Sequence, residues 1–296
     1  MAAAKRLVVC GGNGFLGSRI CQNAVLRGWD VTSISRSGAP KWETVTSSAT
    51  PPSWSHKVSW ERGDILRPAT YAPLLKGADF VVHSMGILLE ADYKGVLRGQ
   101  ESPISGLRKA FAGGPQPGNP LERGVRGDPN SPEEDIRPPE TREQLTYENM
   151  NRDSAIMLAK QASEEANVQA FVFISAAGGA PVLPARYIST KREAEETIAR
   201  AFPRLRSIFV RPPFMYDSSR PITMPLAAMT GVGAMFNGIT GGIFGGLMGA
   251  AGVKPLKVDV VAQAVVQALS DEGVKGPVDV PEIEELANKA WRSTML

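Results

Sequence analysis

The chain has few of the residues that metal centres and disulfide frameworks need. Its 296 residues include two cysteines and two histidines. His56 and His83 stand far apart, and no metal-ligand spacing of Cys and His occurs, so the sequence predicts no metal site. Cys10 and Cys21 lie in apolar stretches. That setting favours two reduced thiols in the core over a disulfide between them, as in a protein that is not secreted.

An excess of one charge is also missing. The 33 Lys and Arg residues nearly balance the 30 Asp and Glu residues, for a net charge of +3. No helix carries a dense Lys/Arg stripe, so nucleic acid is not expected as a partner. The first residues of the sequence show neither a secretory apolar region nor an Arg-rich amphipathic presequence. Because a core strand is expected to begin by Arg6, little room is left for a cleavable targeting segment.

What the chain does have is an alternation of short apolar runs and helical patterns. Its hydrophobic content of 43% suffices for one large domain or two modest ones. Strands are expected within 7–10, 30–35, 58–64, 78–88, 169–179 and 206–217, and helices within 18–27, 71–77, 145–166, around Tyr187 and over 258–270. Such an alternation predicts a parallel sheet with helices on both faces.

Two long stretches interrupt this alternation. Residues 91–145 are rich in Gly, Pro and charge, which predicts a long, partly disordered insertion. Residues 221–253 carry no charge and repeat glycine at a spacing of four, as at Gly238, Gly242 and Gly246. This second stretch fits a membrane-surface or lipid-facing substrate segment, an ordinary flexible loop of a substrate region, or a membrane span.

The first strand and helix enclose a glycine turn, VVCGGNGFLGSRI, with Gly11, Gly14 and Gly17 at intervals of three. Glycine permits a tight turn, a close backbone approach to a pyrophosphate and close packing of helix on strand. The helix that follows directs its free N–H groups and its positive dipole end at the anion. The position between an apolar strand and a periodic helix favours dinucleotide binding over a glycine turn with a packing role alone.

The end of the second strand indicates which dinucleotide is expected. An NAD site commonly has an acidic residue there, which bonds the ribose 2′-hydroxyl. Here the strand ends SISRSG, which offers Arg36 between Ser35 and Ser37 and no carboxylate. Because a guanidinium binds phosphate with paired hydrogen bonds, we expect NADP(H) to be preferred over NAD(H). The alternative is a solvated surface arginine.

The third strand ends in RGDIL, which places Asp64 where it can bond the adenine amine. A helix-capping role is the alternative interpretation of this carboxylate.

A tyrosine and a lysine stand four residues apart in RYISTK, so Tyr187 and Lys191 share one helix face. A nearby ammonium lowers the pKa of a phenol, which suits Tyr187 to act as a general acid or base on a carbonyl or alcohol. Ser175 ends the fifth strand, at the edge where open α/β sheets bind ligands, and its hydroxyl is suited to orient a substrate oxygen. Asn151 precedes them on a helix and is a candidate to hold a water or a backbone kink. Each residue alone also fits an ordinary structural role.

In this order, the motifs GGNGFLG, GDIL, YISTK, RPPFMYD and VDVV resemble an extended or atypical short-chain dehydrogenase/reductase over most of the chain. The stretches GGNGFLGSRICQNAV and VTSISRSG resemble the fungal mitochondrial Rossmann-type proteins associated with the ubiquinone-synthesis complex. More distantly they resemble the Rossmann-type accessory subunit of respiratory complex I. The fourth strand departs from the family, since HSMG stands where an Asn-Asn-Ala-Gly-like end is usual.

The resemblance implies a set of site residues. Its catalytic group is Ser175, Tyr187 and Lys191, and its cofactor contacts are Gly11, Gly14, Phe15, Leu16, Gly17, Arg36, Asp64, Ile65, Ser84 and Lys191.

The fold class expected is therefore α/β, a Rossmann-type doubly wound parallel sheet over 5–216 with a small C-terminal substrate or lipid-facing region over 217–296. Helix 258–270 is expected to pack back on the sheet.

The function that the resemblance implies is that of an NADP(H)-binding reductase-like protein in mitochondrial ubiquinone synthesis, acting on a hydrophobic quinone precursor at the matrix side of the inner membrane. It also implies a place in the ubiquinone-synthesis complex, with peripheral membrane contact. The alternatives are a non-catalytic scaffold or regulatory subunit that NADP(H) stabilises, and a sugar-nucleotide epimerase or dehydratase.

Overall fold

The structure is a computed structural model that describes residues 4–46, 48–86, 146–178, 185–217 and 254–293. The predictions for the insertion at 91–145 and for the uncharged stretch at 221–253 therefore fall outside the described residues.

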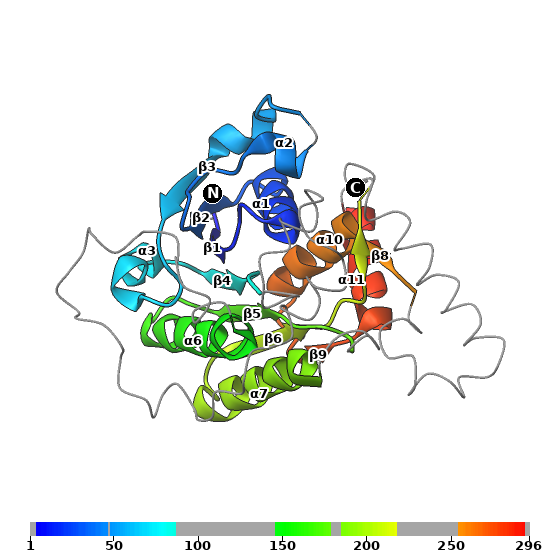
Figure 1. Ribbon diagram of the computed structural model, residues 1–296. Helices are drawn as coiled ribbons and strands as arrows, with labels where there is room; N and C mark the ends of the chain where they lie inside the picture. The colour runs from blue at the N-terminus through cyan, green and yellow to red at the C-terminus, as the bar shows by residue number, and fades with distance from the viewer. Residues whose placement is uncertain (1–3, 47, 87–145, 179–184, 218–253, 294–296) are drawn as a thin grey trace, which may run out of the picture.

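A seven-stranded, all-parallel sheet forms the centre of the molecule (Figure 1), which confirms the predicted fold class. Its spatial order is β3-β2-β1-β4-β5-β6-β9. The strands are β1 (Arg6–Cys10), β2 (Asp30–Ser35), β3 (Val58–Arg62), β4 (Phe80–His83), β5 (Ala170–Ile174), β6 (Arg206–Val210) and β9 (Gly276–Val278). The inner strands are apolar and buried, as is usual where helices cover both faces of a parallel sheet.

The two faces of the sheet carry separate hydrophobic clusters. Because side chains alternate along a strand, Val9 packs on one face and Val8 on the other. The helices of the first face are α1 (Phe15–Leu26), α10 (Val258–Ser270) and α11 (Val280–Ser293), and those of the second are α3 (Ala72–Leu75), α6 (Ser154–Glu164) and α7 (Ala185–Ala201). The helix expected at 258–270 thus packs on the sheet.

The helix predicted over 145–166 is divided in the structure. A π-helical turn, η4 (Glu148–Asp153), comes first, and α6 continues from Ser154. Ser154 Oγ donates a hydrogen bond to the carbonyl of Met150, 2.8 Å away. A wider turn of this kind shifts the following helix by about one residue and often occurs at functional sites.

The single strand predicted over 206–217 is wrong, because β6 ends at Val210 and β7 (Met215–Tyr216) pairs with β8 (Leu256–Lys257) in a second, two-stranded sheet. Sequence patterns left β8 and β9 unassigned, and β9 extends the main sheet beside β6. Short helices lie at α2 (Trp42–Val45), η1 (Ser53–Lys57) and η2 (Pro68–Thr70). Within the described residues, no helix combines the length and the apolar character needed to cross a bilayer.

Candidate functional site

The candidate site lies at the carboxyl ends of β1 and β4, where the order of the sheet reverses. Neighbouring parallel strands whose connections run in opposite directions leave a crevice at this edge. Gly11 follows β1 and donates its N–H to the carbonyl of Ile34 at 2.9 Å, while Ser84 follows β4 and donates its hydroxyl to the carbonyl of Cys10 at 3.0 Å. The expected contact residue Ser84 therefore borders the glycine turn.

The glycine turn needs glycine for two reasons. Gly11 has a φ of 89°, which residues with a side chain rarely adopt. A Cβ at Gly17 would lie 2.1 Å from the carbonyl oxygen of Gly11, and one at Gly14 would lie 3.1 Å from the same oxygen. Without side chains at these positions, α1 begins in direct contact with the end of β1.

Sequence reasoning missed a further glycine of this turn. A Cβ at Gly12 would lie 2.4 Å from Ser33 Oγ and 2.9 Å from Cys21 Sγ, so this position packs the turn against β2 and α1. The signal was present, because the motif begins with two adjacent glycines.

The start of α1 fits an anionic group. Gly14 is its N-cap, with no side chain to bond the first N–H groups, and the first turn has no acidic residue. These N–H groups and the positive dipole end therefore face the edge of the sheet. Leu16 is buried in the core and Phe15 is partly buried against it, so both offer an anion their backbone more than their side chains. The residues present thus fit a pyrophosphate.

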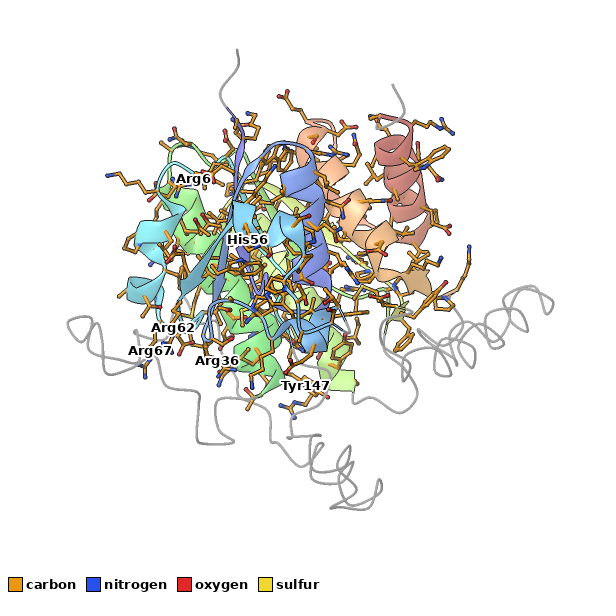
Figure 2. All side chains as sticks on the ribbon, turned by 90° about the horizontal axis from the view of Figure 1, so that it is seen from above. Arg6, Arg36, His56, Arg62, Arg67 and Tyr147 are labelled. Atoms are coloured by element: carbon orange, nitrogen blue, oxygen red, sulfur yellow. The ribbon has the colours of Figure 1, made fainter. Side chains whose placement is uncertain are left out.

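Basic side chains gather at the ends of β2 and β3. Arg36 follows β2, and Arg62 pairs with Ser35 across the two strands. Arg62 Nε donates to the carbonyl of Arg36 at 3.2 Å, and Asn13 Nδ2 donates to Ser37 Oγ at 2.8 Å. Figure 2 shows Arg36 and Arg62 on the same side of the molecule. Arg36 is half-buried and Arg62 is exposed, so both guanidinium groups remain accessible to a phosphate.

Asp64 is buried beside this group and its carboxylate is partly engaged. One oxygen accepts the N–H of Leu66 at 3.1 Å, and the other lies 3.9 Å from Arg67 Nε. The hydrogen bond to Leu66 lies in a turn before η2, whose N-cap is Arg67 without a side-chain cap bond, so Asp64 is not a helix cap. The predicted adenine contact stays a proposal. Ile65 is buried in the core cluster on the α3 and α6 face, which also includes Tyr71 and Leu75.

Tyr187 and Lys191 share one face of α7, as their spacing predicts. Lys191 Nζ lies 5.8 Å from the centroid of the Tyr187 ring and 5.2 Å from that of Phe173. The ammonium donates to the carbonyl of Ile174, the last residue of β5, at 3.0 Å. Lys191 is buried, and burial lowers its pKa to about 8.

The expected lowering of the tyrosine pKa is not seen. Desolvation raises the pKa of Tyr187 to about 12, and the nearby Arg192 cation opposes this rise only in part. The correction follows from burial, which penalises the phenolate more than the cation stabilises it. Tyr187 is therefore a protonated phenol at neutral pH, able to donate a proton.

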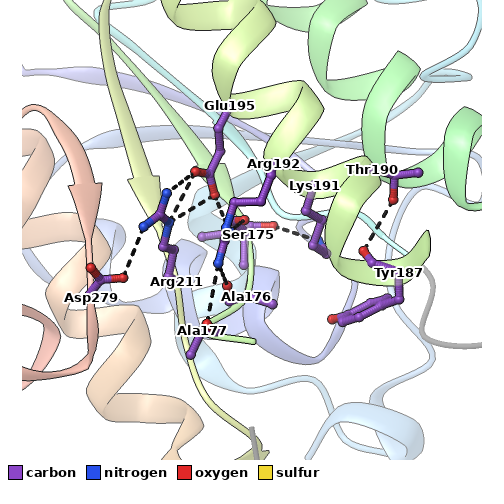
Figure 3. Close-up of polar contacts among 11 residues, drawn as sticks. Ser175, Ala176, Ala177, Tyr187, Thr190, Lys191, Arg192, Glu195, Arg211 and Asp279 are labelled. Atoms are coloured by element: carbon purple, nitrogen blue, oxygen red, sulfur yellow. Dashed lines mark hydrogen bonds and ion pairs between the residues drawn. The ribbon is translucent and has the colours of Figure 1, made fainter. Parts of the chain in front are cut away.

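Ser175 lies at the end of β5, as predicted, but its hydroxyl has another partner (Figure 3). Arg192 Nη1 donates to Ser175 Oγ at 2.9 Å, and Nη2 donates to the carbonyl of Ala176 at 2.7 Å. The arginine also bonds Glu195, which accepts hydrogen bonds from Arg211 as well. Ser175 is thus part of a network of α7 and β6, a partnership that sequence reasoning did not find.

Asn151 approaches the pair from η4. A Cβ at Gly86 would lie 2.9 Å from Asn151 Oδ1 and 3.5 Å from Lys191 Nζ, so both polar groups meet the glycine that ends the HSMG motif. Gly86 has a φ of 152°. The glycine at the end of this motif therefore leaves room for Asn151 and Lys191 beside the backbone.

His83, the last residue of β4, completes the buried polar groups. Its Nε2 lies 2.9 Å from Ser154 Oγ, whose hydroxyl already donates to Met150, so Nε2 carries the proton of a neutral imidazole. Burial lowers the pKa of His83 to about 3, and the charge of Lys191 adds to this effect.

Two sequence comparisons agree with this arrangement. A model of the NAD dependent epimerase/dehydratase family matches residues 7–94. The chain is also 41% identical over 229 residues to "MIOREX complex component 2" of Saccharomyces cerevisiae. The alignment covers 73% of this chain and 74% of the yeast protein.

Solved structures share the fold at low identity. A UDP-glucuronic acid 4-epimerase from Bacillus cereus in complex with NAD is similar with a TM-score of 0.53 and 15% identity, over 93% of this chain and 78% of that one. Vestitone reductase from alfalfa (Medicago sativa) has a TM-score of 0.52 and 16% identity, over 93% and 76%. At such identities the likeness supports the fold alone.

Proposed function

Because the chain belongs to the same family as yeast MIOREX complex component 2 and its residues 7–94 match the NAD dependent epimerase/dehydratase family, we propose that it binds NADP(H) at the ends of β1, β2 and β4 and reduces a carbonyl group. This family is the one that the sequence motifs led us to expect.

One observation supports cofactor binding above the others. The N-terminus of α1 meets a turn in which a Cβ at Gly17 would lie 2.1 Å from the carbonyl oxygen of Gly11, and the helix start has no side-chain cap. This is the geometry in which backbone N–H groups hold a pyrophosphate.

The preference for NADP(H) is proposed from Arg36 and Arg62. The Arg62 side chain donates through Nε to the backbone carbonyl of Arg36 at 3.2 Å, which joins the ends of β2 and β3, and each guanidinium can also donate to phosphate oxygens. No carboxylate follows Ser35, so nothing at the end of β2 selects a free ribose hydroxyl.

The proposed chemistry uses Tyr187 as the acid. A bound nicotinamide would supply the hydride that the carbonyl carbon needs. Tyr187 gives its phenolic proton to the carbonyl oxygen, so a C–H and an O–H bond form and an alcohol results. A pKa of about 12 suits this direction, because the phenol is protonated before the reaction and remains a stronger acid than an alcohol. Lys191 stabilises the resulting phenolate.

The substrate proposed is a hydrophobic quinone precursor, and the setting is a mitochondrial complex at the inner membrane. The uncharged composition of 221–253 supports an apolar substrate or lipid contact, and the name of the yeast relative describes that protein as a component of a complex. The link to ubiquinone synthesis rests on the resemblance of the glycine turn and second strand.

A second candidate is a non-catalytic subunit that NADP(H) stabilises. The contact of Ser175 with Arg192 favours it, because it gives that hydroxyl a structural partner on α7 that needs no substrate. Tyr187→Phe separates the two candidates. If the protein is a reductase, the variant will bind NADPH normally and fail to restore quinone in cells that lack the protein. Full restoration would contradict catalysis and support the subunit.

A sugar-nucleotide epimerase is also compatible with the family and with the fold neighbours. Binding of UDP by the NADPH-loaded protein would favour this reading over a quinone-type substrate.

The cofactor preference is tested with Arg36→Ala and Arg62→Ala. Since charge-assisted hydrogen bonds contribute about 1.5–3 kcal/mol each, each variant should bind NADPH about tenfold or more weakly and bind NADH as before. Arg204→Ala, an exposed arginine beyond α7, is the control. Equal loss of NADPH and NADH affinity would contradict a 2′-phosphate site.

A further inference from the structure

The first turn of α7 is tied to η4 by a charged pair. Arg186, the residue before Tyr187, donates hydrogen bonds to the carboxylate of Glu148 from Nε and Nη2, along one edge of its guanidinium. Nη2 lies 2.9 Å from Oε1 and 2.7 Å from Oε2, and Nε lies 3.1 Å from Oε1. The side chain of Glu148 is 4% exposed. A buried carboxylate held by such a fork has a fixed position and direction.

The same pair also holds an aromatic contact. The guanidinium of Arg186 lies 5.8 Å from the centroid of the Tyr147 ring. Tyr147 is fully buried, and its ring meets that of Tyr187 edge-on, with centroids 5.8 Å apart and an angle of 70°. Tyr187 is therefore constrained through the backbone, by its neighbour Arg186, and through its ring, by Tyr147.

A second ion pair joins η4 to α7, with the arginine on η4 and the glutamate on α7. Arg152 of η4 donates to Glu193 of α7 at 2.9 Å, and the Glu193 side chain is 50% exposed. This pair lies farther along α7. It links η4 to the helix without touching the turn that carries Tyr187.

We propose that Glu148 is a positioning residue for Tyr187. Its carboxylate fixes Arg186, and together with Tyr147 it sets the direction in which the phenol faces the cofactor edge of the sheet. The π-helical turn contributes by bringing Glu148 and Asn151 toward α7 from one short segment. This role rests on the proposed function of Tyr187, but the orientation of the ring is measurable without any reaction.

The test is the ¹⁹F spectrum of the full chain labelled with 3-fluorotyrosine. The chain has five tyrosines, and loss of one line in Tyr187→Phe assigns that residue. In the wild type, the neighbouring Tyr147 ring should displace the Tyr187 line from the position of free fluorotyrosine. Glu148→Gln, which keeps the shape and removes the charge, should abolish most of this displacement and leave the line of the buried Tyr71 unchanged.

Two further variants keep the result decisive. Arg186→Lys retains the charge but loses the two-pronged contact with the carboxylate, so it should move the Tyr187 line as Glu148→Gln does. It gives an independent result if Glu148→Gln folds poorly. Glu193→Gln is the matched control between the same two elements and should leave the line in place. The proposal is overturned if neither Glu148→Gln nor Arg186→Lys moves the Tyr187 line, or if Glu193→Gln moves it equally.

Titration of the wild type with NADPH keeps this inference separate from the proposed function. Absence of NADPH binding would contradict the proposed function, whereas the ¹⁹F result alone decides the role of Glu148.

Discussion

Gly17 is the residue on which the candidate cofactor site depends most closely. A Cβ there would lie 2.1 Å from the Gly11 carbonyl oxygen and 2.7 Å from Ser84 Oγ, so α1 must shift to admit it. Gly17→Ala should lower the free energy of unfolding by about 3 kcal/mol, at the upper end of overpacking effects, and weaken NADPH binding. Urea denaturation and nucleotide titration measure both.

Gly28→Ala is the control for this change. Gly28 has a φ of 75° but open space around its missing Cβ, so only backbone strain of about 1–2 kcal/mol is expected and NADPH affinity should persist. Equal effects of the two substitutions on nucleotide binding would contradict the packing role of Gly17.

His83 gives a prediction about pH. In the folded protein the pKa of this imidazole is about 3. In the unfolded chain the pKa of a histidine is about 6.5. The free energy of unfolding should therefore fall as the pH is lowered through this window. In ¹H–¹⁵N spectra, His83 should stay protonated at Nε2 alone from about pH 8 to about pH 5, with His56→Gln assigning the signals. A midpoint above pH 5 would refute the buried neutral state.

Residue types and spacing predicted part of this site. The glycine turn and the shared face of Tyr187 and Lys191 follow from local sequence. The partner of Ser175 did not, because Arg192 stands seventeen residues away and its contact depends on how α7 packs on β5. The raised pKa of Tyr187 was missed for the same reason, since burial is a tertiary property.

At the scale of elements, hydrogen bonds to Glu195 connect α7 to the end of β6 in the sheet. This buried carboxylate accepts hydrogen bonds from Arg192 on its own helix and from Arg211 after β6. Glu195→Gln would remove the counter-charge between Arg192 and Arg211 and leave Arg211 with only the exposed Asp279, 3.5 Å away. Breaking a buried pair in this way typically costs about 3–5 kcal/mol of unfolding free energy, and thermal or urea unfolding would show it.

The neighbouring Glu196 supplies the control. It pairs with Arg200 at 3.4 Å, with side chains 73% and 70% exposed. Glu196→Gln should leave stability almost unchanged, because exposed pairs contribute little. A similar loss in both variants would show that α7 is not held through Glu195.

Regular elements were the easier part of the prediction. The bounds of β2 and α10 match those expected, since each has a clear apolar pattern and a definite end. The π-helical turn η4 was not predicted, because it retains a helical pattern and adds one residue to a turn. β9 was missed because its three residues, GPV, carry no strand pattern and join the sheet only through β6.

At the scale of the whole molecule, the order of the sheet gathers the candidate site at one edge. Gly11 after β1, Arg36 after β2, Ser84 after β4 and Ser175 after β5 come from distant parts of the chain and meet at the carboxyl ends of the strands. Parallel topology explains why the order of motifs in the sequence predicted this meeting.

The most direct test of the account is calorimetric titration of the wild-type chain with NADPH and with NADH at physiological salt. The account predicts that NADPH binds, and binds about tenfold or more tightly than NADH, because phosphate pairing with arginine is charge-assisted. Absence of binding by either nucleotide at millimolar concentration, or tighter binding of NADH, would contradict it.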